Sequence, residues 1–186
     1  MTGEDWRPTA IEGVLLRHNV DHPDGRGTFT ELWRASLTGP LTDQPMVQSN
    51  LSRSRAGVLR GMHFHLHQAD LWLLIEGRAV AAVTDVRPAL RGEPVTSEII
   101  EMSAGDALFI PAKVAHGFLA LTDMALVYLV TNEYDGTDEH GFAWDDPAAA
   151  IAWPATPGII SDRDRANPTL AQLIATLRQR AQIEGA

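Results

Sequence analysis

The sequence contains no cysteine, so disulfide bonds and thiolate metal sites are excluded throughout the 186-residue chain. Lysine is almost as rare, with Lys113 the single lysine of the sequence. If a site in this protein needs an ammonium group, only Lys113 can supply it. Tyrosine occurs twice, at Tyr128 and Tyr134.

Positive charge is also scarce: 15 Lys and Arg residues face 24 Asp and Glu residues, and the formal net charge is −9. This balance argues against a broad basic surface for nucleic acid, although a local arginine cluster can still hold a phosphorylated small molecule. No apolar run reaches the length needed to span a membrane, and the start MTGEDWRPTA lacks the apolar region of a signal peptide. We therefore expect a cytoplasmic protein with no nucleic-acid or membrane partner.

Short runs rich in Val, Ile, Leu, Thr and aromatic residues, separated by Gly, Pro and Asp, recur along most of the chain. This spacing is typical of a mostly antiparallel β-sandwich or barrel and not of alternating strands and helices. The segment around Glu76 and Gly77 resembles a hairpin turn. The stretch GDALFIPAKVAHGF predicts a strand that enters a proline turn, which presents His116.

One amphipathic helix is predicted near the end of the chain. Asn167 can cap it with Pro168 at its first position, and apolar residues then recur at helical spacing, at Leu170, Leu173, Ile174 and Leu177. We expect a single domain over residues 1–186, with a β core at about residues 10–155 and the helix at about residues 168–183.

Three histidines stand at alternate positions in the stretch RGMHFHLHQAD, at His63, His65 and His67. In a regular strand over residues 60–67 they share one face, and we expect His63 and His65 to point into a barrel. The alternative interpretation is that the three histidines form the polar, solvent-facing side of a strand. His116, at the end of a second predicted strand, favours a cluster of histidines inside the barrel.

Six stretches follow one another along the chain: RGTFTE, VQSNLSRSRAGVLRGMHFH, TDVRP, IPAKVAHGFLAL, EYDGTDEHGFAWDDPAAAIAWP and ISDRDRANPTL. Together, and in this order, they resemble the dTDP-4-dehydrorhamnose 3,5-epimerase family of the cupin superfamily, which inverts sugar carbons beside a 4-keto group. The resemblance implies an all-β cupin jelly roll, a double-stranded β-helix, with a short C-terminal helix. It also implies no cofactor, and a homodimer in which an N-terminal strand is exchanged between subunits.

The chemistry of such an enzyme explains the residue types. A ketone at C4 acidifies the protons on C3 and C5, so epimerisation needs a base on one face of the sugar, an acid on the other, and stabilisation of the enolate oxygen. By position, the resemblance assigns His63 as the base, Asp164 as the carboxylate that orients it, and Tyr134 as the acid. Without the resemblance, Asp164 is equally expected as a carboxylate at a helix N-terminus, and Tyr134 as a packing residue.

The resemblance also implies a substrate, a dTDP-linked 4-keto-6-deoxyhexose. Guanidinium groups suit its phosphates even on an acidic protein. The residues that fall at the family's substrate-binding positions are Arg26, Phe29, Glu31, Gln48, Asn50, Arg60 and His116.

Two positions in the opening histidine stretch depart from the family. His65 replaces a Gln or Ala, and Asp70 replaces a lysine that helps to hold the sugar keto oxygen as it becomes an enolate. A carboxylate there opposes the developing charge by on the order of several kcal/mol. Asp70 therefore needs a partner, and the alternation of the strand makes His65 or His67 the nearest candidates.

A metal site is the alternative account of these departures. His63, His65, Asp70 and His116 match the ligand spacing of metal-binding cupins, with Asp in place of Glu, and such a set suits Zn, Fe(II), Mn or Ni. We expect no metal, because a metal-bound His63 cannot also act as the base that Asp164 orients. Besides epimerisation, the sequence leaves open a sugar-nucleotide-binding cupin without epimerase activity and a metal-dependent cupin isomerase.

Overall fold

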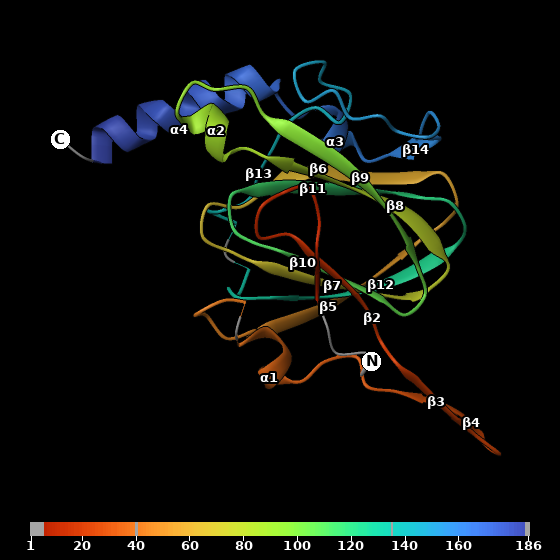
Figure 1. Cartoon of the computed structure of the whole chain (residues 1–186). Coiled ribbons are helices and arrows are strands. Elements are labelled where there is room, and N and C mark those ends of the chain that lie inside the picture. Colours follow the sequence, from red (N-terminus) through yellow and green to blue (C-terminus); the bar gives the residue numbers. More distant parts are fainter. Residues whose placement is uncertain (1–5, 40, 135, 185–186) are drawn as a thin grey trace.

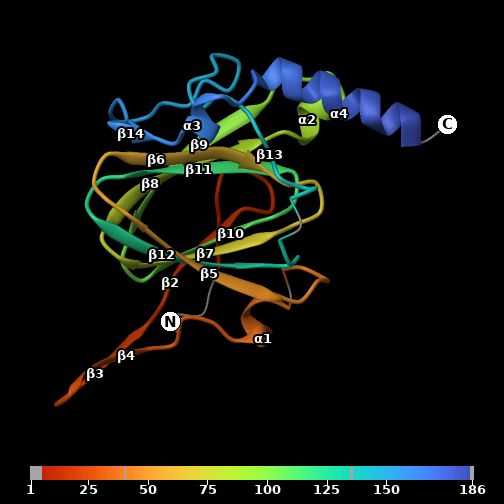
Figure 2. The same cartoon turned by 180° about the vertical axis from the view of Figure 1, so that it is seen from behind.

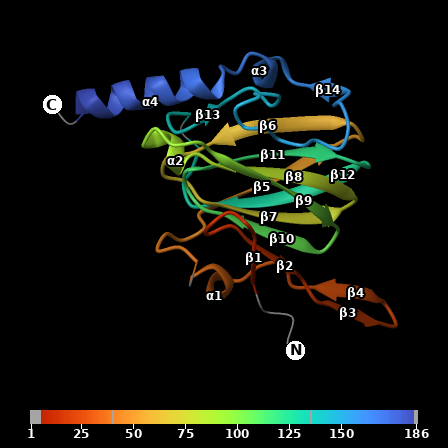
Figure 3. The same cartoon turned by 45° about the horizontal axis from the view of Figure 1, so that its top comes forward.

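Two β-sheets face each other and enclose a barrel (Figures 1 and 3) in the computed structural model, which describes residues 6–39, 41–134 and 136–184. The first sheet has the order β1-β2-β10-β7-β12-β5. The second has the order β13-β6-β11-β8-β9, with β14 pairing in parallel with β6. The predicted all-β jelly roll with a C-terminal helix is confirmed, while the ends of the predicted domain, residues 1–5 and 185–186, lie outside the described residues.

The elements have the following bounds. The first sheet contains β1 (Arg7–Pro8), β2 (Leu15–His18), β5 (Gln48–Ser54), β7 (Asp70–Glu76), β10 (Asp106–Ile110) and β12 (Met124–Val130). The second contains β6 (Val58–Phe64), β8 (Arg78–Asp85), β9 (Thr96–Ser103), β11 (Val114–Ala120), β13 (His140–Gly141) and β14 (Ile159–Ile160). A separate hairpin consists of β3 (Asp21–Asp24) and β4 (Gly27–Thr30), and the helices are α1 (Ala35–Thr38), α2 (Arg87–Leu90), α3 (Asp162–Arg165) and α4 (Leu170–Glu184).

The turn at Gly77 carries the chain from one sheet to the other, so the hairpin predicted there is wrong. Strand β7 pairs with β10 and β12, whereas β8 pairs with β9 and β11. Gly77 has a φ of +83°, and a Cβ atom at this position would lie 2.3 Å from the carbonyl oxygen of Asp123. Only glycine tolerates both the positive φ and the close contact. Gly77, which suggested a hairpin turn, therefore lies in the connection between the two sheets.

Over its last three residues, Met62, His63 and Phe64, strand β6 separates the barrel interior from an outer core by alternation. Met62 and Phe64 are fully buried on its outer face, in one cluster with Phe142 and the apolar face of α4. His63, between them, therefore points into the barrel. The strand ends at Phe64, so the expectation of a strand through residue 67 is wrong beyond that point.

The residues after β6 form a loop held by Asp138. Its carboxylate accepts hydrogen bonds from the backbone N–H groups of Leu66 and His67, at 2.7 and 2.8 Å. His65 still lines the barrel interior, whereas His67 is exposed. The predicted inward direction of His63 and His65 is confirmed, although alternation within one strand explains only the first.

Helix α4 covers the outer face of the second sheet together with α2 (Figures 1 and 2). Its predicted apolar face is buried, but it begins two residues later than predicted. Thr169, and not Asn167, caps it, because the Thr169 hydroxyl accepts from the Gln172 N–H at 3.2 Å and Gln172 Oε1 accepts from the Thr169 N–H at 2.9 Å. This reciprocal pair is a capping box. Among the described residues, no helix has the length and apolar character to cross a lipid bilayer.

The cap predicts a measurable contribution to stability. We expect Thr169→Ala to lower the free energy of unfolding by about 1 kcal/mol, because the Gln172 N–H loses its acceptor. Urea denaturation measures this change. The matched control is Thr176→Ala in the same helix, which should leave stability unchanged or slightly higher because alanine has the greater helix propensity. Equal losses in the two variants would contradict the cap assignment.

Candidate active site

A cavity of about 460 Å³ lies inside the barrel, within the size range of small-molecule sites. Both sheets contribute to it. The first supplies Gln48 and Asn50 from β5, Asp70 and Trp72 from β7, and Tyr128 from β12; the second supplies Arg60 and His63 from β6 and His116 from β11. The cavity is therefore lined mainly by rigid strands, while His65, Tyr134 and Glu139 join it from loops.

His63 and Asp164 form a pair at the wall of this cavity. His63 Nε2 lies 2.9 Å from Asp164 Oδ1, and the Asp164 side chain is 5% exposed. A carboxylate only accepts hydrogen bonds, so Nε2 carries the hydrogen and Nδ1 of a neutral His63 keeps the lone pair. The geometry thus fixes the tautomer that leaves one nitrogen able to take a proton.

The short helix α3 holds Asp164 in place over β6. Its N-cap residue, Ser161, accepts a hydrogen bond from the Asp164 N–H at 3.1 Å, and the Gly61 N–H donates to Asp164 Oδ2 at 3.3 Å. Burial alone would raise the pKa of the Asp164 carboxyl. The hydrogen bond and charge of His63, with the donors from Gly61 and Ser161, outweigh burial and lower this pKa. Asp164 is therefore ionised at neutral pH.

His116 faces His63 directly across the pairing of β11 with β6. It is buried, its ring packs edge-on against Trp72 with the centroids 5.3 Å apart, and its Nδ1 lies 3.1 Å from the carbonyl oxygen of Val114. Burial lowers the pKa of His116 to about 4, and His65 and His63 act in the same direction, while Asp70 opposes them. The His116 imidazole is therefore neutral at neutral pH.

Asp70 has other partners than predicted. Its Oδ1 accepts a hydrogen bond from Gln68 Nε2 at 2.8 Å, and its Oδ2 lies 3.6 Å from His116 Nε2. His65 instead places Nδ1 at 2.8 Å from the carbonyl oxygen of Asp138, and His67 is exposed outside the cavity. The expectation that His65 or His67 pairs with Asp70 is wrong, because Asp70 begins a strand of the opposite sheet, where its neighbour across the cavity is β11.

The acid candidate, Tyr134, stands at the rim of the cavity with 70% of the residue exposed. Its backbone N–H donates to Gln48 Oε1 at 3.0 Å. Beside it, Arg163 Nη1 lies 2.7 Å from Glu139 Oε1. Burial would raise the pKa of Glu139, but the hydrogen bond and charge of Arg163, together with a hydrogen bond from Tyr134, lower it.

The predicted substrate-binding residues fall into two groups. Gln48, Asn50, Arg60 and His116 line the cavity. Arg26, Phe29 and Glu31 do not, because they lie on or beside the β3-β4 hairpin, which extends away from the barrel (Figures 1 and 2). Within this chain Arg26 binds Asp24 and Glu31 binds Arg34. Lys113 is exposed in the turn before β11 and is not among the cavity residues.

Several residues in or beside the cavity were not identified from the sequence. Glu139 and Arg163 form an ion pair at the rim, and Gln68 and Asp138 hold Asp70 and His65 through hydrogen bonds. Arg163 immediately precedes Asp164, and Asp138 and Glu139 lie in the stretch EYDGTDEHG, which belongs to one of the family motifs. Their places next to family motifs could have marked these residues as candidates. Their partners are distant in the chain, however, and only folding brings Arg163 to Glu139 and Asp138 to His65.

The fold and the cavity define a cupin-type jelly roll with a histidine–aspartate pair facing the interior of the barrel. Residues 8–172 match the family model described as dTDP-4-dehydrorhamnose 3,5-epimerase. The dTDP-4-dehydrorhamnose 3,5-epimerase of Streptomyces griseus is 37% identical over 177 residues, which cover 90% of this chain and 87% of that protein. The chain belongs to the dTDP-4-dehydrorhamnose 3,5-epimerase family, a family of isomerases.

Solved structures agree with this assignment. The dTDP-6-deoxy-D-glucose-3,5-epimerase of Legionella pneumophila, solved with dTDP-4-keto-L-rhamnose, superposes with a TM-score of 0.84 at 29% identity and covers 93% of this chain and 96% of its own. The 3'-monoepimerase ChmJ of Streptomyces bikiniensis, solved with dTDP-quinovose, gives a TM-score of 0.82 at 32% identity over 96% of both chains. Relatives that invert one carbon and relatives that invert two thus share this fold.

The lowered pKa of Asp164 predicts how stability depends on pH. A carboxyl whose pKa is lower in the folded state stabilises the protein above its ordinary value of 3.8 and loses this contribution as the pH falls through the folded value. We expect Asp164→Asn to reduce the free energy of unfolding by about 2 kcal/mol at pH 7, and the difference from wild type to shrink at pH values below 3.8.

Urea unfolding at a series of pH values tests this expectation. The matched control is Asp162→Asn, an exposed carboxylate in the same short helix. Its effect should stay within about 0.5 kcal/mol at every pH. A difference between Asp164→Asn and wild type that is constant down to the lowest pH would contradict an ionised, hydrogen-bonded Asp164.

Proposed function

We propose that this chain is an epimerase that inverts a carbon next to the keto group of a dTDP-linked 4-keto-6-deoxyhexose. The observation that carries the proposal is the His63–Asp164 pair, 2.9 Å apart and facing a cavity large enough for a sugar. Membership of the epimerase family supports the substrate class. The cytoplasmic location expected from the sequence stays a prediction.

In the proposed reaction, His63 Nδ1 removes the proton from the carbon beside the ketone, and the electron pair of the broken C–H bond moves into an enolate. Asp164 remains ionised and balances the imidazolium that forms. Tyr134 then delivers a proton from its hydroxyl to the opposite face of the same carbon, which inverts the configuration. Its hydrogen bond to Glu139, beside Arg163, holds this hydroxyl at the rim.

The roles of His63 and Tyr134 can be separated by deuterium uptake. We expect His63→Ala to lower incorporation of deuterium from heavy water into the substrate by at least about 100-fold, because the variant lacks the imidazole that takes the proton. Tyr134→Phe should retain exchange but form little inverted product, because the first proton leaves without the acid. Mass spectrometry measures exchange, and proton NMR measures inversion.

The exposed histidine next to the cavity supplies the matched control, since His67→Ala should exchange at the wild-type rate. Undiminished exchange in His63→Ala would refute the assignment of the base. Wild-type protein that binds dTDP but takes up no deuterium would instead identify a sugar-nucleotide-binding protein without epimerase activity, which is the alternative left open by the sequence.

We further propose that the protein works as a homodimer in which the β3-β4 hairpin of one subunit completes the cavity of the other. The hairpin extends from the barrel, and Phe29 at its centre is 68% exposed. Arg26 lies in the exposed turn of the hairpin and is not among the residues that line the cavity of its own chain. In such a dimer, Arg26 and Phe29 would contact the substrate bound in the cavity of the partner subunit.

A mixed dimer tests this arrangement. Arg26→Ala and His63→Ala chains should each be nearly inactive, but co-expressed they form hybrids in which one cavity combines an intact His63 with an intact Arg26 of the other subunit. Random pairing should then restore about a quarter of the wild-type active sites. A mixture no more active than its two components, or a monomer by light scattering, would contradict the proposed exchange.

A further inference from the structure

We propose that His65, Asp70 and His116 bind a divalent first-row transition-metal ion inside the barrel, next to the base but not bound to it. The site itself follows from the side-chain geometry. Only the role of the ion in catalysis rests on the epimerase function proposed above.

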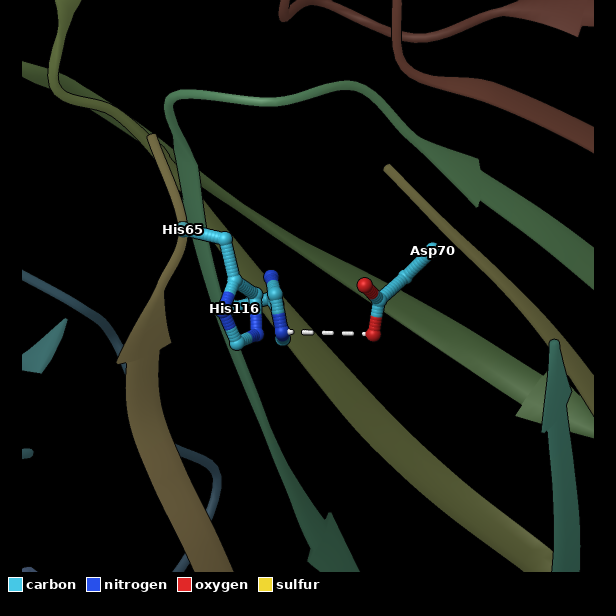
Figure 4. A group of neighbouring side chains, drawn as sticks. All are labelled: His65, Asp70 and His116. Carbon is cyan, nitrogen blue, oxygen red and sulfur yellow. Dashed lines mark ion pairs between the residues drawn. The ribbon is translucent and has the colours of Figure 1, made fainter. Parts of the chain in front are cut away.

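The three side chains converge from three different segments onto one point (Figure 4). One ligand atom from each lies within 4.8 Å of those of the other two. Asp70 and His116 are each 4% exposed, and their facing atoms, Oδ2 and Nε2, lie 3.6 Å apart. Ligands bonded at about 2.0–2.2 Å in a tetrahedral arrangement are separated by about 3.3–3.6 Å, so this spacing suits a shared metal ion.

The surrounding hydrogen bonds leave only acceptor atoms at this point. The carbonyl oxygens of Asp138 and Val114 lie 2.8 and 3.1 Å from the Nδ1 atoms of His65 and His116. Carbonyl oxygens only accept, so each Nδ1 carries the ring hydrogen and each Nε2 keeps its lone pair. Two imidazole lone pairs and a carboxylate oxygen therefore face one another within the barrel.

Facing acceptors repel unless a cation lies between them. The 3.6 Å separation of His116 Nε2 from Asp70 Oδ2 is also longer than a hydrogen bond. Backbone carbonyls behind the histidines, and Gln68 behind Asp70 Oδ1, supply the outer hydrogen bonds that commonly orient metal ligands. Neutral imidazoles with a carboxylate suit a borderline ion such as Zn²⁺ or Co²⁺.

The sequence argued against a metal because one of its four candidate ligands, His63, is also the candidate base. The geometry of the fold removes this conflict. The four-residue set includes His63, which cannot be both a ligand and a free base. In the fold His63 binds Asp164, and the remaining three residues form the cluster without it. An ion held there would neutralise Asp70 and present a positive charge to the developing enolate, which this chain cannot obtain from a lysine at that position.

Metal binding to the full-length protein tests the site directly. After treatment with a chelator, titration with Co²⁺ should give one ion per chain, seen as visible d–d absorption that Zn²⁺ displaces. We expect Asp70→Asn to weaken Co²⁺ binding by about 100-fold or more, and Gln68→Ala by about 10- to 100-fold because it frees the ligating carboxylate.

Two histidine variants serve as controls for this titration. His67→Ala, two positions beyond the ligand His65 and exposed, should bind Co²⁺ as the wild type does. His63→Ala should also retain the wild-type affinity, because His63 lies outside the cluster. Wild-type protein that binds Co²⁺ no more tightly than Asp70→Asn would overturn the proposal, and equal losses in His63→Ala and Asp70→Asn would overturn the separation of the ion from the base.

Failure of the site and failure of the epimerase function give different results. Full deuterium uptake by metal-free protein would uphold epimerisation and overturn the role of the ion. Stoichiometric Co²⁺ binding without any deuterium uptake would uphold the site and contradict epimerisation. Loss of uptake on chelation, with recovery on adding Zn²⁺ or Co²⁺, supports both.

Discussion

The candidate site depends on the packing of strand β6 beneath the C-terminal helices. Met62 and Phe64 are buried against the apolar face of α4, so the residue between them, His63, has to face the barrel interior. A shift of one residue in β6 would turn His63 outward and place two large apolar side chains in the cavity. The same packing seats α3 over β6, which brings Asp164 to His63.

Two buried carboxylates with different surroundings give the cavity its electrostatic character. Asp164 is met by donors from His63, Gly61 and Ser161, and these lower its pKa despite burial. Asp70 receives one donor, from Gln68, and otherwise faces an imidazole nitrogen that carries a lone pair. The first carboxylate is satisfied by the protein alone, whereas the second has room for a cation.

This contrast suits a member of the epimerase family that has an aspartate, Asp70, in the cavity where the family has a lysine. The proton-transfer pair is separated from the position that differs, because His63 and Asp164 lie on one wall and Asp70 comes from the facing sheet. A change of charge at Asp70 therefore need not disturb the base. In the proposed site the carboxylate of Asp70 acts together with His65, the second position that departs from the family, to hold the ion that would face the enolate.

The sequence by itself determined the all-β class through its short apolar runs between turn residues, and the buried face of the C-terminal helix through a period of 3.6. Alternation put His63 and His65 on one face, and His116 favoured the barrel interior for that face. The family motifs also assigned roles to Asp164 and Tyr134. The fold brings Asp164 to His63 and Tyr134 to the rim of the cavity, and the roles themselves stay proposals. Tertiary structure decided the crossing at Gly77, the end of β6 before His65, the pairing of Asp70 across the cavity and the position of Arg26 outside it. Periodicity specifies which face a side chain occupies along one strand, but the partner opposite depends on how distant strands pair, and only the folded chain establishes that.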